Sequence, residues 1–400
     1  MPRTSTLITA LFFSCSLAVG LIAAEPQPPF DFGLDLTVEG SAGVTGGFER
    51  GQALHGLALL HGSWKPAGKT GEGAGLTGYA SLLGLAGQGP TRRYLGDFLA
   101  ASNIEGYESF RLYSWWLQAA GQDWSLRAGA LLADEEFTGT AVGGNFFNSA
   151  FGWPAFISAN IVNTGPAFFV AAPGLRLEKT WGETAAWRLG IYDGDTFDSP
   201  TGDPTVNRYG LHYQVGGAQG WFLISEAAFT PAGGSTRLKV GAWLHTADFA
   251  DVRDDASGQP FAVSGRDPRN HSSNHGLYAI VEHTLSGESG QAGHLEVYAR
   301  VGGAPGDRNA ISWAVDTGLG WTGPMTWSPL DWPMRTSARL SPGTPGWRIR
   351  PAPRPTSSRP SSLPMRSSCP IASSSSPTCN TSAIPAAALP SATRWRSWSG

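Results

Sequence analysis

Short segments in which apolar and polar residues alternate recur along residues 35–330, and they restrict the fold more than any other feature of the chain. In one of them, Leu238, Val240 and Leu244 alternate with polar or small residues. A period of two is that of a β-strand with one apolar face. No stretch shows a competing helical period, so we predict an all-β fold. About thirteen such segments of about ten residues are separated by Gly, Asn, Asp and Pro clusters: 36–48, 53–63, 76–87, 109–119, 123–132, 174–181, 186–193, 207–215, 220–229, 237–245, 276–285, 295–301 and 311–321.

The composition excludes several classes of protein. After residue 24 no apolar run reaches the roughly 20 residues that a membrane-spanning helix needs. Three cysteines are too few for a disulfide scaffold. A formal net charge of −3 gives no basic field for nucleic acid. Gly at 53 and Pro at 29 of 400 residues favour many turns between short strands.

The first 24 residues have the features of a secretory signal peptide. Arg3 supplies a positive charge, Leu7–Ala24 is mostly apolar, and Ala23 and Ala24 offer small residues for cleavage. A signal anchor is the alternative. Residues 25–34 are then a short lead-in to the β-rich region at 35–330.

The last 70 residues, 331–400, have a different composition. They contain nine Arg, no Lys and one acid, a net charge of +8 that leaves −11 for the rest of the chain. They also hold 12 of the 29 prolines and 16 serines. Proline cannot pair within a central strand or continue a helix. We therefore expect a low-complexity, disordered tail that lies outside the sheet.

The apolar faces of several segments carry Tyr or Trp, namely Tyr209, Tyr213, Trp313 and Trp321. Such rings suit the interface between membrane and water. Arg, Lys, Glu and Asp occupy the opposite faces. An apolar outside, aromatic girdles and a polar interior are typical of a transmembrane antiparallel β-barrel. A secreted sandwich or a β-helix would show a similar alternation and is the alternative.

Seven blocks, in order over residues 35–325, resemble the carbohydrate-selective porins of the OprB type. The first is Asn103–Leu117, NIEGYESFRLYSWWL. The others are LRAGALLADEEF at 126–137, NFFNSAFGWP at 145–154, APGLRL at 172–177, GIYDGD at 190–195, GAWLHT at 241–246 and ARVGGAPGDRN at 299–309. The resemblance implies a sixteen-stranded outer-membrane channel of a Gram-negative bacterium that passes sugars. Its partners would be sugars and outer-membrane lipid, with a homotrimer as one assembly that the sequence allows.

The tail at 331–400 departs from this family, in which further strands are expected there. A neighbouring reading frame through Asp331–Arg339 can encode a strand-like sequence, so a frameshift explains the change. A genuine linker or a divergent tail is the alternative. The barrel of this chain is therefore expected to be incomplete, with an open seam between a first strand near Leu36 and a last strand near Trp313–Trp321.

A sugar channel needs hydrogen-bond donors and acceptors in a wet interior, and the planar fork of Arg can bridge adjacent hydroxyls. Pairing each Arg with a carboxylate avoids a strong anion field. For any single residue, the alternative is that it only forms a hydrogen bond or ion pair with a neighbouring side chain, or that it faces bulk water. The lumen or substrate-contact candidates by parity are Arg127, Arg176, Glu178, Arg188, Arg208, His212, Arg237, Lys239, Trp243, His245, Glu296, Arg300 and Asp316.

The segment Gly143–Pro154 is rich in aromatic residues for a surface loop. We predict that it folds inward and narrows the pore. Packing of its rings against the barrel rim is the alternative. The constriction-loop candidates are Asn145, Phe147, Asn148 and Trp153.

No enzyme motif is found, and no catalytic, cofactor or metal role is assigned. Asn270–His275 has two histidines without an evident third ligand and is interpreted as a polar loop. The function predicted is passive, carbohydrate-selective diffusion of sugars such as monosaccharides. The alternatives are a secreted or surface carbohydrate-binding β-protein without transport, and a structural outer-membrane barrel.

Overall fold

A computed structural model describes residues 29–66, 75–232, 234–288 and 293–323, together with the backbone of 9–20 and 367–371. Fourteen strands form one sheet in which each strand pairs antiparallel with its neighbours. They follow one another in chain order, except that a separate hairpin interrupts the sequence between β10 and β13. The strands are β1 Thr9–Gly20, β2 Phe30–Thr45, β3 Gly51–Trp64, β4 Gly75–Gly87, β5 Ser109–Ala120, β6 Trp124–Leu131, β7 Ala172–Trp181, β8 Ala185–Asp193, β9 Trp221–Phe229, β10 Thr236–His245, β13 Asn274–Ser286, β14 His294–Gly303, β15 Trp313–Gly323 and β16 Ser367–Ile371.

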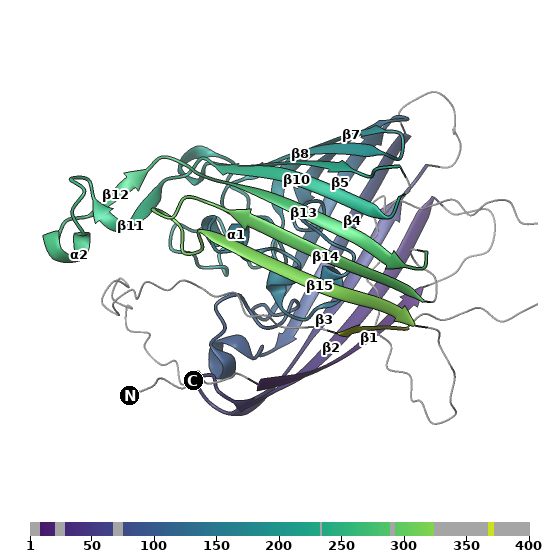
Figure 1. Cartoon of the computed structure of the whole chain (residues 1–400), viewed down its shortest axis with the longest axis horizontal. Coiled ribbons are helices and arrows are strands. Elements are labelled where there is room, and N and C mark those ends of the chain that lie inside the picture. Colours follow the sequence, from purple (N-terminus) through teal and green to yellow (C-terminus); the bar gives the residue numbers. More distant parts are fainter. Residues whose placement is uncertain are drawn as a thin grey trace, which may run out of the picture.

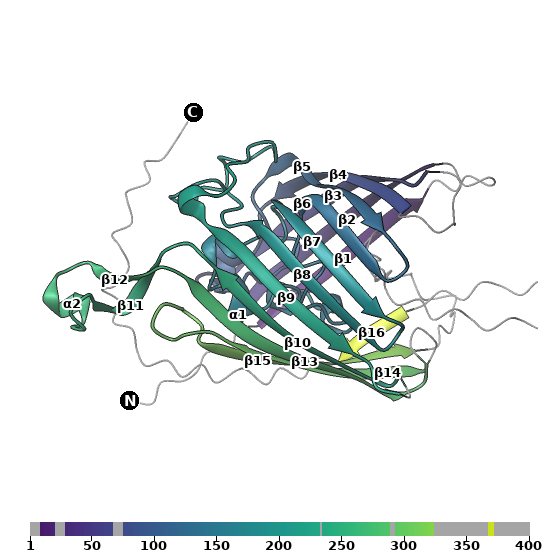
Figure 2. The same cartoon turned by 90° about the horizontal axis from the view of Figure 1, so that it is seen from above.

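The sheet curls around a long loop, 132–171, that connects β6 to β7 and carries the short helix α1, Ala155–Ser158 (Figures 1 and 2). Short connections such as 121–123 and 182–184 lie at one end of the strands, and long loops lie at the other. Within the described residues no pairing joins β1 to β16, so the sheet is an incomplete antiparallel barrel. Single helical turns occur at Thr91–Leu95, Gly143–Asn145, Ser149–Phe151, Val162–Thr164 and Gly217–Gln219.

The separate hairpin projects beyond the long-loop end of the barrel (Figure 1). It consists of β11, Phe249–Asp255, and β12, Pro268–His271, with the four-residue helix α2, Phe261–Ser264, between them. In the part of the chain that the structure describes, no helix is both long and apolar enough to span a membrane.

Twelve of the thirteen segments predicted from alternation are strands. The prediction for 207–215 is wrong, because these residues belong to the loop between β8 and β9. The loop lies against the edge of β5, where the Leu112 N–H donates to the Tyr209 carbonyl at 3.0 Å. Gly210 has a φ of +67°, and a Cβ there would lie 1.9 Å from the Leu112 carbonyl oxygen. Tyr209 and Tyr213 are therefore loop residues rather than strand residues.

Two sheet edges differ from expectation. Ser367–Ile371 from the predicted tail forms β16 and pairs with β15, so the expectation that the whole tail lies outside the sheet is wrong for these five residues. Proline is tolerated on an edge strand, which explains Pro370. Thr9–Gly20 of the predicted leader forms β1 and pairs with β2. The rest of both segments lies outside the described residues, as does the region 324–330.

The alternation separates two faces of the sheet. On β10, Leu238 and Val240 are 42% and 59% exposed and point outward, whereas Lys239 and Trp243 are buried on the inner side. Because arginine or lysine on the lipid face at mid-bilayer costs about 2–4 kcal/mol, this orientation is the one that a membrane favours.

Candidate functional site

The loop 132–171 fills part of the space inside the curved sheet and has an apolar core of its own. Phe137, Phe156 and Ile157 are fully buried. They pack with inward side chains of the wall strands. Figure 1 shows α1 of this loop enclosed by the strands. We call residues 132–171 the inner loop. The wall residues in its apolar core are Trp116, Tyr192, Phe222, Ile224, Trp243, Tyr278 and Ile280.

Glu136 of the inner loop lies between two arginines of the wall. It forms an ion pair with Arg127 of β6, and its Oε2 lies 3.1 Å from Nε of Arg176 on β7. All three side chains are almost completely buried. Burial alone would raise the pKa of Glu136, but the charges of Arg127 and Arg176 outweigh it and hold that pKa below its usual value. The carboxylate is therefore charged and fastens the inner loop to the wall.

Arg188 of β8 extends this cluster. Its guanidinium forms an ion pair with Glu178 of β7 and donates to the backbone carbonyl of Glu136 at 3.1 Å. The strand register places Glu178 opposite Arg188, which accounts for the pairing.

A second cluster lies on the wall strands β14 and β15. Arg300 is fully buried, and its Nε lies 2.9 Å from Oδ2 of Asp316. The other guanidinium nitrogens donate to the carbonyls of Thr138 at 2.9 Å and Ala150 at 2.8 Å. Tyr298 completes the cluster by donating to Asp316 Oδ1 at 2.8 Å. Arg300 therefore connects the wall to two separate parts of the inner loop.

A third cluster lies between them, on β10 and β13. Lys239 Nζ lies 2.9 Å from Glu282 Oε2 and donates to the Gly139 carbonyl. Glu282 also accepts the Ala141 N–H at 2.9 Å. In the segment 138–141, a wall cation thus donates to a backbone carbonyl, and a wall carboxylate accepts from a backbone N–H.

The remaining lumen candidates are more scattered. Trp243 packs in the apolar core, and Glu296 lies 3.2 Å from His294 on the same strand. Arg237 is half-buried near the short-turn end of β10. His245 is buried, with its Nε2 2.8 Å from the Gly194 carbonyl.

Arg208 and His212 are exposed on the loop that was expected to be a strand, and the structure does not bring them to the three clusters.

The four constriction-loop candidates divide into two pairs. Trp153 is 6% exposed and donates its indole N–H to the Thr164 carbonyl at 2.8 Å. Asn148 accepts the Ala150 N–H and donates to Asp97, both within 2.9 Å. Asn145 and Phe147 are exposed. Trp153 and Asn148 therefore maintain the shape of the inner loop, while Asn145 and Phe147 are accessible from its surface.

Three buried carboxylates in or against the inner loop were not predicted from the sequence: Glu136, Glu226 and Glu282. Glu226 of β9 accepts the Thr138 N–H at 2.9 Å and the Tyr278 hydroxyl at 3.0 Å. Glu226 and Glu282 lie in predicted strand segments, on the face that points inward. The alternation of residues could therefore have identified them. Glu136 lies on no strand, and its position depends on the path of the inner loop.

The outer face carries apolar and aromatic residues at both rims. Trp124, Trp181 and Trp321 are exposed at the short-turn ends of their strands. Trp221 and Trp313 are exposed at the long-loop ends. Exposed aromatic residues at both ends of the strands are typical of the two aromatic girdles of a barrel in a membrane.

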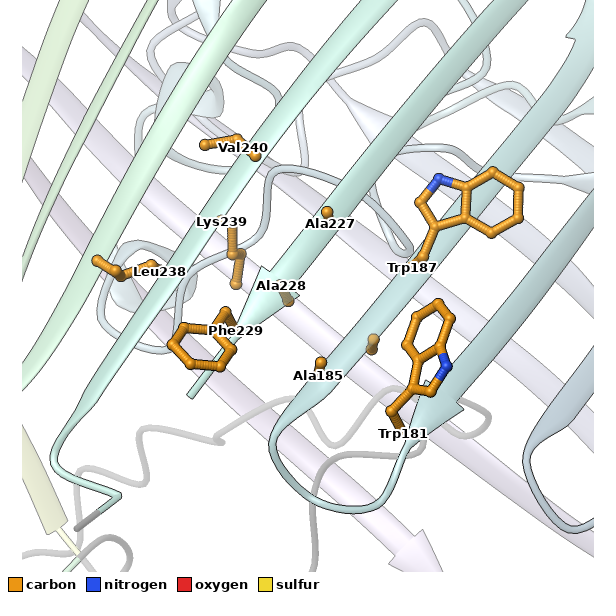
Figure 3. Close-up of a pocket in the computed structure, with 10 residues that line it drawn as sticks. Trp181, Ala185, Trp187, Ala227, Ala228, Phe229, Leu238, Lys239 and Val240 are labelled. Carbon is orange, nitrogen blue, oxygen red and sulfur yellow. The ribbon is translucent and has the colours of Figure 1, made fainter. Parts of the chain in front are cut away.

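A shallow groove of about 510 Å³ runs over the outer face of β7 to β10 (Figure 3). Ala185 and Ala227 are among the small residues that line it, and Trp181 and Trp187 stand on one side. The Trp187 indole N–H donates to the Ser225 hydroxyl at 2.9 Å, which satisfies the polar atom of this ring on an apolar face.

These features agree with a comparison against known families. The family profile described as "Carbohydrate-selective porin, OprB family" matches residues 69–332, more than half of the chain. The chain belongs to this family. Porin B of Pseudomonas aeruginosa is 23% identical over 235 residues, which are 56% of this chain and 49% of Porin B. The chain thus spans about half the length of that relative.

A solved structure entitled "High pH structure of Pseudomonas putida OprB" has the same fold. It superposes with a TM-score of 0.63 at 19% identity, over 74% of this chain and 71% of that one. The profile match shows the family, and the superposition shows the fold of a porin.

Proposed function

We propose that this chain is an outer-membrane porin that allows passive, carbohydrate-selective diffusion of sugars such as monosaccharides. The observation that carries the proposal is the separation of faces. Charged clusters centred on Glu136, Lys239 and Arg300 lie inside the sheet, and exposed apolar side chains lie outside it. A secreted carbohydrate-binding protein has no need of the exposed apolar outer face, because water favours its burial.

The structure suggests how sugar selectivity arises. Since the wall cations of the three clusters are paired with carboxylates, these clusters add little net field and do not select strongly for anions. We propose that sugars contact two exposed side chains of the inner loop, Asn145 and Phe147. We also propose contacts with Arg237 and Glu296, two lumen candidates that lie outside the three clusters. An amide, a guanidinium and a carboxylate offer donors and acceptors to hydroxyls, and a phenyl ring offers a flat surface to a sugar ring.

The proposal includes a location and partners. A signal peptide at 1–24 would export the chain to the outer membrane of a Gram-negative bacterium, and lipid would contact the outer face. Removal of the leader would leave β2 as the edge of the sheet. Assembly into a homotrimer is one option, and the mass of the purified complex in detergent tests it.

Reconstitution into planar bilayers tests the function. We expect ion conductance that added sugars reduce, and no cleavage of oligosaccharides. Conductance that sugars never alter would support a structural barrel instead. Sugar binding without any conductance would support the surface binding protein. Phe147→Ala is expected to weaken the sugar block, and the exposed loop variant Phe98→Ala is the matched control.

A further inference from the structure

Three side chains that can ligate a metal meet at the base of the hairpin that projects beyond the barrel (Figure 1). They are Asp251 on β11, His271 at the end of β12, and Asp307 in the loop between β14 and β15. One ligand atom from each lies within 4.8 Å of the other two. They are separate from the three clusters around the inner loop and have no part in the proposed sugar path.

The distances between the ligand atoms suit one shared ion. His271 Nε2 lies 3.0 Å from Asp251 Oδ2 and 4.0 Å from Asp307 Oδ2. In a tetrahedral zinc site with bonds of about 2.0 Å, ligand atoms are about 3.3 Å apart. Small side-chain movements therefore bring all three atoms to bonding distance of a single cation.

The backbone holds two of these ligands in place. Asp251 is buried, and its Oδ1 accepts the N–H groups of Arg253 at 2.9 Å and Asp254 at 2.8 Å. This leaves Oδ2 directed at His271. The Val252 N–H donates to the Asp307 carbonyl at 2.7 Å, which fixes the loop next to the hairpin.

The local charge is compatible with a cation. The carboxylates of Asp251, Asp254 and Asp307 outnumber the guanidinium groups of Arg253 and Arg308. Arg308 donates from Nε to Asp307 Oδ1 at 2.8 Å and from Nη2 to Oδ2 at 3.1 Å. A cation at Oδ2 would replace the hydrogen bond from Nη2, while the bond from Nε to Oδ1 can remain, since a carboxylate has two accepting oxygens.

We propose that Asp251, His271 and Asp307 bind one zinc-type divalent cation, with water in the remaining position. One imidazole nitrogen and two carboxylate oxygens form a set that Zn²⁺ accepts, whereas Ca²⁺ takes six to eight oxygens. The bound ion joins the hairpin to the loop between β14 and β15. The His271 partners lie far from it in sequence, Asp251 being twenty residues earlier, so the segment 270–275 alone does not reveal the site.

Titration of the full chain in detergent with ZnCl₂, after treatment with a chelator, tests the proposal by calorimetry. We expect saturable binding of one zinc per chain. His271→Ala and Asp251→Asn should weaken it at least about tenfold. His275→Ala, which removes an exposed histidine of β13, is the matched control and should leave binding unchanged. CaCl₂ should not compete at equal concentration.

Two further measurements separate loss of ligation from loss of folding. Co²⁺ should give visible absorption bands with the parent chain and with His275→Ala, but not with His271→Ala. Zinc should slow trypsin cleavage at Arg266, within the hairpin, in the parent chain and in His275→Ala, but not in His271→Ala. Zinc affinity that is equal in His271→Ala and the parent chain, or lost in His275→Ala, would refute the site, as would the absence of saturable binding by the parent chain.

Discussion

Arg300 on β14 lies opposite Asp316 on β15 in the strand register, with 2.9 Å between Nε and Oδ2. The same guanidinium donates to the carbonyls of Thr138, Ala150 and Phe151 in the inner loop. One fully buried side chain thus pairs two strands and positions a loop that is about 150 residues away in sequence. In each of the three clusters, an ion pair between neighbouring wall strands also contacts the inner loop.

Replacing Arg300 should loosen the inner loop without opening the wall. Arg300→Ala leaves the carbonyls of Thr138 and Ala150 without a donor and Asp316 without its cation. Breaking a buried ion pair costs about 3–5 kcal/mol, reduced here because Asp316 is partly exposed. We expect larger and noisier single-channel conductance in bilayers. Arg92→Ala, at an exposed loop position, is the control, and identical traces for both variants would contradict the role of Arg300.

The outer face of β10 should not tolerate charge. Val240 is 59% exposed on this face, and arginine there costs about 2–4 kcal/mol in a bilayer. Val240→Arg should therefore lower the urea midpoint of unfolding in lipid vesicles. Val263→Arg is the control, because Val263 is 83% exposed on α2 of the projecting hairpin. Equal midpoints for the two variants would mean that β10 does not face lipid.

Acidification should weaken the attachment of the inner loop through Glu136. Its pKa in the folded chain is below the usual 4.5, so its contribution to stability is fully present above that pH and is lost as the pH falls through the folded pKa. Unfolding of the parent chain and of Glu136→Gln should therefore differ by a constant amount from neutral pH down to about 4.5, and by less below it. A difference that grows on acidification would reverse the sign argued here.

Substitutions of Trp153 and Phe147 should have different effects: the first on the stability of the inner loop, the second on sugar binding. Trp153→Ala removes a buried ring that packs against Phe222, with 6.2 Å between ring centroids, and should cost about 3–5 kcal/mol of stability. Phe147→Ala removes a ring that is 36% exposed and should lower the melting temperature much less than Trp153→Ala does, while it weakens the sugar block. Melting curves and sugar titrations in bilayers, measured on both variants, check this division.

The reading frame near Thr326–Trp332 is the subject of a further prediction. We expect resequencing of these codons to reveal an inserted or deleted base, and the restored frame to encode further strands that close the barrel. Closure removes unpaired strand edges, each unpaired backbone group in lipid costing several kcal/mol. An intact frame, together with stable insertion of the present chain into outer membranes, would refute the frameshift account.

The alternation of residues predicted the strands and their two faces because both follow from the geometry of a single strand. On β10 it separates Lys239 from Val240 correctly. Alternation failed at 207–215, where contact with Leu112 and the backbone freedom of Gly210 decide the conformation. It also gave no information on Glu136, because a loop has no fixed period. Asp251 and Asp307, which we propose as zinc ligands, come together only through the tertiary fold.

The inner loop has a consequence for how an unclosed sheet keeps its curvature. Its contacts reach β6 and β7 through Glu136, β10 and β13 through the segment 138–141, and β14 through Arg300. These strands lie on different sides of the curl, and each is fixed to the same central body. The inner loop therefore acts as an internal scaffold that keeps the sheet curved, although no pairing joins the first and last of the described strands.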